Sequence, residues 1–144
     1  MRIMREIEIE GKRAIALFDT GSMHTYVREH LLIGIPSWTI LKPYRVAIGG
    51  KSIEVQKIYH VNGRIEGLDF DTEVLPIDEI GKINGQNIDV IIGALTMEKW
   101  EILVNPKDGT LDLSGLKRRE FTEFWKSDKG LSLQLQALLF HYRF

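Results

Sequence analysis

Residues 14–22 read Ala-Ile-Ala-Leu-Phe-Asp-Thr-Gly-Ser, an apolar run that ends in a carboxylate, a hydroxyl, a glycine and a second hydroxyl. The apolar run predicts a buried strand, and the residues after it predict a turn that presents Asp19. A buried carboxylate is costly unless hydrogen-bond donors surround it or a raised pKa keeps it protonated. Gly21 allows a tight turn that brings its N–H near the carboxylate, and the hydroxyls of Thr20 and Ser22 can also donate. Taken alone, the stretch is equally compatible with an ordinary Asx turn at a strand end.

Two further stretches carry glycines at positions where a backbone turns or crosses. Residues 89–94 read Asp-Val-Ile-Ile-Gly-Ala, which predicts a short core strand of β-branched residues before a helix, with Gly93 permitting a close backbone crossing. Residues 45–53 read Arg-Val-Ala-Ile-Gly-Gly-Lys-Ser-Ile, which predicts a hairpin turning at Gly49-Gly50. Local sequence alone favours an ordinary surface hairpin at least as much as a hairpin with a functional role.

The three stretches, taken in their order along the chain, resemble the retropepsin-like aspartic proteases. The resemblance runs over roughly residues 5 to 114, from the Asp-Thr-Gly-Ser signature through a glycine-rich flap hairpin to the Gly93 strand. It implies an all-β fold, a closed acid-protease barrel with one short helix. We expect that helix at residues 94–100, which have helical propensity, with Leu95 and Met97 available for burial.

The resemblance also implies a catalytic site made from two chains. A chain of 144 residues is enough for one domain, and Asp-Thr-Gly occurs in it once. The family needs two carboxylates, so the second Asp19 must come from the other subunit of a homodimer that hydrolyses a peptide or protein substrate. The implied catalytic residues are Asp19, Thr20 and Gly21; Ser22 and Gly93 support the catalytic loop; Ile48, Gly49 and Gly50 form the substrate-binding flap.

Ser22 has a particular implied role in this site. A hydroxyl at its position can donate to the outer oxygen of the Asp19 carboxylate, which favours the ionised form. Replacement of Ser22 by alanine would then move the pH profile of activity toward higher pH.

The chain departs from the viral members of the family at one place. Those members often have an arginine directly after the glycine that corresponds to Gly93, and this arginine pairs with an acid just downstream of the signature. This chain has Ala94 in place of the arginine, and Met23, His24 and Thr25 where the acid is expected. The departure puts viral-type dimer contacts in doubt more than catalysis. A second hypothesis stays open because a fold does not by itself determine function: a catalytically silent module that uses the same fold for dimerisation or peptide binding.

Composition narrows the remaining classes of function. The net charge is −1, from 19 basic and 20 acidic residues, so nucleic acid is not expected as a partner. The chain has no cysteine, and its four histidines have no paired ligand spacing, so neither a metal nor another cofactor is expected. Residues 1–10 do not read as a signal peptide, and no apolar run approaches membrane-spanning length, so we expect a cytoplasmic protein without membrane contact.

The rest of the chain predicts further hairpins and a change of character near residue 115. Strands are expected at residues 3–10 and 14–18, 44–48 and 52–58, 59–65 and 70–75, and 102–104 and 110–113. A loop is expected at residues 76–87. We expect a protease domain at residues 1–115 and an extension at residues 116–144, which would pack on the body or on a neighbouring subunit. The alternative for the extension is a basic docking patch at residues 117–119. Within the extension Phe121, Phe124 and Trp125 have helical spacing, and residues 131–135 alternate as in a strand.

Overall fold

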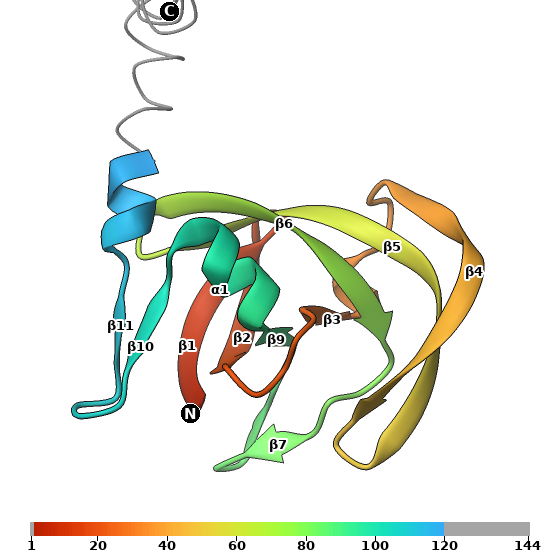
Figure 1. The fold of residues 1–144 in the computed structure, drawn as a ribbon, viewed down its shortest axis with the longest axis horizontal. Coiled ribbons are helices and arrows are strands. Elements are labelled where there is room, and N and C mark those ends of the chain that lie inside the picture. The colour runs from red at the N-terminus through yellow and green to blue at the C-terminus, as the bar shows by residue number, and fades with distance from the viewer. Residues whose placement is uncertain (1, 120–144) are drawn as a thin grey trace, which may run out of the picture.

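The computed structural model describes residues 2–119, and these form a mostly β structure with one short α-helix in the body (Figure 1). Most of the strands belong to a single sheet. In chain order the elements are β1 (Arg2–Ile9), β2 (Lys12–Asp19), β3 (Tyr26–Arg28), a 3-10 turn (Glu29–Leu31), β4 (Ser37–Ile48), β5 (Lys51–Ile65), β6 (Leu68–Ile77), β7 (Lys82–Ile83), β8 (Gln86–Asn87), β9 (Val90–Ile92), α1 (Ala94–Trp100), β10 (Leu103–Asn105) and β11 (Thr110–Asp112).

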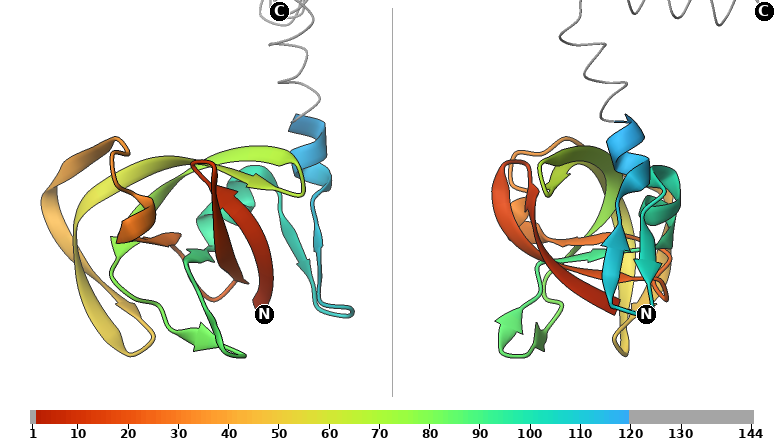
Figure 2. Two further views of the ribbon diagram at one scale, coloured as in Figure 1. Left: turned by 180° about the vertical axis from the view of Figure 1, so that it is seen from behind. Right: turned by 90° about the vertical axis from the view of Figure 1, so that its left-hand side faces the viewer.

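The main sheet curls back on itself. Its strand order is β1-β2-β9-β3-β6-β5-β4, and β1 also pairs with β5 through Glu8↔Arg64 and Ile9↔Gly63. Six strands therefore form a ring, with β4 outside it as an extra strand on β5. The ring is visible in the right-hand view of Figure 2. The sequence predicted a closed barrel; the observed sheet is a ring that is joined at β1 and β5 through only these two residue pairs.

The residues of β2 and β9 explain why these strands run through the interior. Ala14, Ala16 and Phe18 alternate along β2 and are each no more than 1% exposed, and they belong to the main hydrophobic core. All three residues of β9 are buried, as a strand covered on both faces requires. A second, smaller cluster contains Tyr26, Val55, Leu75, Ile77 and Ile91.

Several predicted elements are confirmed, and three expectations need correction. The α1 helix, the hairpin at Gly49-Gly50 and the β10–β11 hairpin lie where the sequence predicted them. Residues 76–87 are not wholly a loop, because they include the small β7–β8 hairpin. The strands of the Gly49-Gly50 hairpin are also longer than predicted. Met97 is 4% exposed but Leu95 is 52% exposed, because residues two apart in a helix point to different faces and cannot both meet the core.

Residues 114–119, directly after β11, are helical. In Figure 1 they and the β10–β11 hairpin lie at the end of the molecule opposite β4. The predicted helical face at Phe121, Phe124 and Trp125 and the predicted strand at residues 131–135 lie outside the described residues. Within residues 2–119, no helix has both the length and the apolar character needed to cross a membrane.

Candidate active site

Asp19 is the last residue of β2, and its side chain is half-buried. The backbone N–H of Gly21 donates to its carboxylate oxygen Oδ1 at 2.9 Å, and the N–H of Ser22 donates to its carbonyl oxygen at 3.1 Å. A side chain at position 21 would bring its Cβ within 3.2 Å of the same Oδ1, closer than ordinary van der Waals contact. The predicted tight turn, with the glycine N–H on the carboxylate, is confirmed.

Strand pairing fixes the direction in which this turn leaves the sheet. β2 runs parallel to β9, with Ala16↔Val90 and Phe18↔Ile92 in register, so Asp19 and Gly93 follow the same ends of neighbouring strands. At the opposite end, Asp89 joins three strands: its Oδ2 accepts from the N–H of Ile15 at 2.9 Å, and its Oδ1 lies 3.3 Å from Nη1 of Arg28. Asp89 therefore helps to hold the strands that carry the turn.

Gly93 lies directly against the loop that follows the turn. A Cβ at this position would be 2.2 Å from the carbonyl oxygen of His24 and 2.8 Å from that of Met23, so only glycine fits. The adjacent amides bond the same loop, with Ala94 N donating to the Ser22 carbonyl at 2.6 Å and Leu95 N to the Met23 carbonyl at 3.1 Å. The first amides of a helix have no partner within the helix. The loop thus caps α1, and the predicted close crossing at Gly93 is confirmed.

The prediction that the Ser22 hydroxyl donates to the Asp19 carboxylate is wrong. The Ser22 hydroxyl donates to the carbonyl oxygen of His24, two residues further on, at 2.9 Å. A hydroxyl has one proton to donate, so this bond uses its whole donor capacity. Ser22 therefore bonds the backbone of the loop that follows Asp19.

The β4–β5 hairpin turns at the two predicted glycines. Gly49 and Gly50 have φ of +53° and +79°, a pair of left-handed conformations that suits a two-residue hairpin turn. A Cβ at either position would meet nothing within 4 Å, so the tip has open space around it. Ile48 is half-buried against the smaller hydrophobic cluster, which includes Tyr26 from β3.

Sequence reasoning missed a contact between that hairpin and the loop after Asp19. The centre of the His24 ring lies 6.1 Å from the centre of the Tyr44 ring of β4. It lies 6.4 Å from the centre of the Tyr26 ring, which it meets edge-on. Burial raises the pKa of Tyr26, and the nearby Tyr44 raises it further. The spacing of the histidines gave no sign of this contact, because residues 24 and 44 are brought together only by the packing of the fold.

A wide apolar groove begins beside the Asp19 turn. It has a volume of about 1060 Å³ and is bordered by Thr20 and by residues of α1, the β10–β11 hairpin and the helical segment after it. Its apolar lining includes Met97, Ile102, Leu103 and Val104, and the Leu103 side chain is 60% exposed. Among residues 2–119, no three histidine, aspartate or glutamate side chains gather in a way that could hold a metal ion.

Comparison with known proteins gives a likeness of fold and no relative by sequence. No family model matches the chain, and no curated protein matches it. The retroviral protease-like domain of Ddi1 from Leishmania major superimposes with a TM-score of 0.52 and 16% identity, over 78% of this chain and 87% of that one. The foamy viral protease-reverse transcriptase in complex with an RNA/DNA hybrid gives a TM-score of 0.51 and 14% identity, over 69% of this chain and 12% of that one. The protein therefore has a retropepsin-like fold.

Proposed function

We propose that the protein is an aspartic endopeptidase whose active site is made by two Asp19 carboxylates, one from each subunit of a homodimer. The observation that carries the proposal is the turn at Asp19. It sits at the end of a buried strand in a retropepsin-like fold, its carboxylate accepts from Gly21 N–H, and its loop is held against Gly93. A domain that only bound peptides would have no chemical need for this carboxylate.

The chemistry follows from bringing two like charges together. Two carboxylates a few ångströms apart cannot both ionise cheaply, so the pair shares one proton. The ionised member takes a proton from a water between them, and this water attacks the scissile carbonyl. The protonated member donates to the carbonyl oxygen and stabilises the tetrahedral intermediate, so the pair acts as general base and general acid. Thr20 would brace the two loops at the two-fold axis, and Gly21 would orient the carboxylates.

The groove beside Thr20 is the surface that such a dimer would bury. If two Asp19 side chains meet across a two-fold axis, the surface next to Thr20 must face its own copy, because a two-fold interface uses the same patch on both subunits. An apolar groove with an exposed leucine suits this requirement. The β4–β5 hairpin, with Ile48, Gly49 and Gly50 at its tip, would close over the bound peptide as a flap.

The test is cleavage of an unfolded protein and of a mixed peptide library, read by mass spectrometry at several chain concentrations. We expect specific activity to rise with concentration and to disappear in Asp19→Asn, whose amide oxygen can still accept from Gly21 N–H so that the thermal unfolding curve changes little. No cleavage by the wild type under acidic or neutral conditions would refute the enzyme and favour the peptide-binding or dimerisation module.

A further inference from the structure

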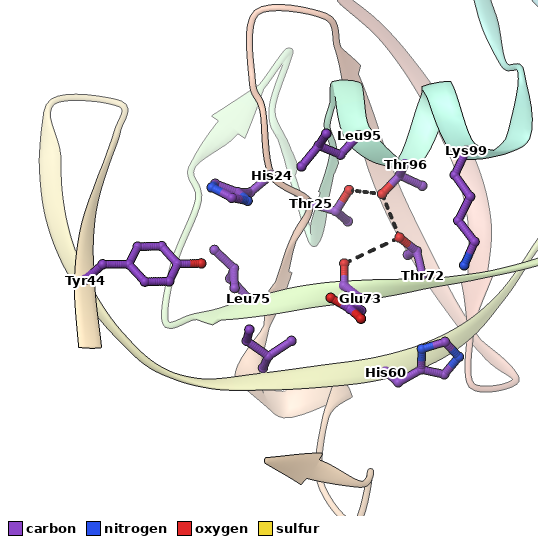
Figure 3. A pocket seen from close by; sticks show the side chains of 11 residues that line it. His24, Thr25, Tyr44, His60, Thr72, Glu73, Leu75, Leu95, Thr96 and Lys99 are labelled. Atoms are coloured by element: carbon purple, nitrogen blue, oxygen red, sulfur yellow. Dashed lines mark hydrogen bonds between the residues drawn. The ribbon is translucent and has the colours of Figure 1, made fainter. Parts of the chain in front are cut away.

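A second cavity lies between α1 and strands β4, β5 and β6, and Figure 3 shows the side chains around it. Its volume is about 320 Å³, near the lower end of the roughly 300–1,000 Å³ typical of ligand pockets. It is separate from the groove beside Thr20, because the two share no lining residue.

Two elements of the proposed active site meet at one end of this cavity. His24 comes from the loop after Asp19, and Tyr44 comes from the strand that leads into the β4–β5 hairpin. The centres of their rings are 6.1 Å apart. A peptide held between the Asp19 turn and this hairpin would pass these two residues, and one of its side chains would be next to the cavity.

The walls of the cavity suit an aromatic ring. Ile58, Leu75 and Leu95 are among its lining residues and present aliphatic side chains from β5, β6 and α1, respectively. Leu95 is 52% exposed although it belongs to the helix that covers the core. An aromatic side chain inserted against it would remove this apolar surface from water.

Three buried threonines form one side of the cavity, and their hydroxyls are hydrogen-bonded in series. The groups at the two ends of this series determine which hydroxyl donates to which. Gly93 N–H can only donate, and it donates to Thr25 Oγ1 at 3.0 Å. The Glu73 carbonyl can only accept, and it accepts from Thr72 at 3.4 Å. Thr96 Oγ1 lies 2.5 Å from Thr25 Oγ1 and 2.7 Å from Thr72 Oγ1. Thr25 therefore donates to Thr96, and Thr96 donates to Thr72. With every donor used, these hydroxyls can offer a ligand only lone pairs.

The residues that line the cavity also include a hydrogen-bond donor. Lys99 also lines the cavity, and its ammonium carries three N–H groups, of which one bonds Asp71 at 3.0 Å. A group that reaches this end meets threonine lone pairs that accept and an ammonium that donates. A phenolic hydroxyl does both, whereas the tip of a phenylalanine does neither.

We propose that this cavity is a specificity subsite that takes a tyrosine side chain of the peptide substrate, with His24 and Tyr44 at its mouth. The inference rests on the proposed function, since it names the substrate that the site would select. The ring lies between the aliphatic walls, and the hydroxyl lies near the threonines and Lys99.

The experiment compares cleavage of peptide series that differ only by Tyr, Phe, Leu or Ala at one position, scanned along the peptide. At one position we expect kcat/KM for Tyr to exceed that for Ala by at least about tenfold, from ring burial. We expect Tyr to exceed Phe by about three- to tenfold, from one hydrogen bond. Leu95→Trp should fill the cavity and remove this preference, whereas Ile33→Trp, at a site 76% exposed elsewhere on the surface, should keep it.

The outcomes separate the two proposals. An active wild type that shows no preference for Tyr, or a Leu95→Trp variant that keeps it, overturns the subsite and leaves the peptidase standing. An inactive wild type refutes the proposed function, and the subsite as a determinant of cleavage is refuted with it. Binding of the same peptides to Asp19→Asn, followed through the methyl resonances of Leu75 and Leu95, then decides whether the cavity takes a tyrosine at all.

Discussion

At the scale of single residues, Gly93 lies so close to the His24 carbonyl that the loop after Asp19 leaves no room for a side chain at position 93. Its φ of −96° is accessible to any residue, so the demand for glycine comes from space alone. We expect Gly93→Ala to destabilise the fold by about 3 kcal/mol, because the added Cβ meets backbone that cannot move away alone.

Gly109→Ala is the matched control for this change, measured in the same denaturant titrations. Its Cβ has open space but φ is +68°, so it should cost only the backbone strain of about 1–2 kcal/mol. If Gly93→Ala were no more destabilising than Gly109→Ala, the close approach would be contradicted.

Replacing Ser22 by alanine tests whether its hydroxyl donates to the His24 carbonyl or to the Asp19 carboxylate. Because the hydroxyl donates to the His24 carbonyl, Ser22→Ala should lower the free energy of unfolding by about 1 kcal/mol and leave the pH–kcat/KM curve where it is. A shift of the acid limb toward higher pH would mean that the hydroxyl turns to Asp19 in solution, as the sequence led us to expect.

The residues of the site differ in how far sequence alone could predict them. The Asp19–Gly21 bond was predictable because the two residues are neighbours, and the crossing at Gly93 was predictable because a glycine directly after a buried strand permits a close backbone approach. The partner of Ser22 was not, because a hydroxyl has several acceptors within reach and the loop geometry selects one. The meeting of His24 and Tyr44 was not either, because it depends on how two distant segments pack.

At the scale of elements, the β4–β5 hairpin and the β5–β6 hairpin provide a natural comparison. Gly50 and Gly67 both have φ of +79°, and a Cβ at either would meet nothing within 4 Å, so valine should strain each by about 1–2 kcal/mol. We expect Gly50→Val to lower kcat/KM by at least about tenfold, equivalent to about 1.4 kcal/mol of activation free energy, because a flap must move and approach the substrate backbone.

Gly67→Val, equally strained, should lose stability and keep its turnover. Steady-state kinetics and thermal unfolding of both variants give the answer. Equal effects on turnover would return the Gly49-Gly50 hairpin to the class of ordinary surface hairpins.

Elements were predictable where a local signal marks them and were missed where pairing partners lie far apart. The glycine pair at residues 49–50 located the β4–β5 hairpin, and the β-branched residues of β9 located a buried strand. The contact of β1 with β5 that joins the ring, and the parallel pairing of β3 with β6, have no local signature in the sequence. The β7–β8 hairpin was missed because its strands are only two residues long.

At the scale of the whole molecule, the proposed dimer makes a prediction about the groove beside Thr20. Leu103→Asp should raise the dimer dissociation constant at least about tenfold and reduce activity in proportion, because it removes apolar burial and places a charge in the interface. The side chain is 60% exposed in the single chain, so the fold should survive.

Ile33→Asp is the control, since its side chain is 76% exposed and does not line the groove. Sedimentation velocity of both variants, alongside activity, measures the effect. If Leu103→Asp associates as the wild type does, the interface lies elsewhere on the molecule.

The most direct test of the two-chain active site is a subunit-mixing experiment. Wild type and Asp19→Asn are unfolded together, refolded at a fixed total concentration above the dimer dissociation constant, and assayed across the full range of wild-type fractions. If each site needs two Asp19 carboxylates, only wild-type pairs are active, so activity should follow the square of the wild-type fraction and be about one quarter at equal mixing. Activity that falls linearly with the wild-type fraction would contradict a shared site and assign catalysis to the single chain.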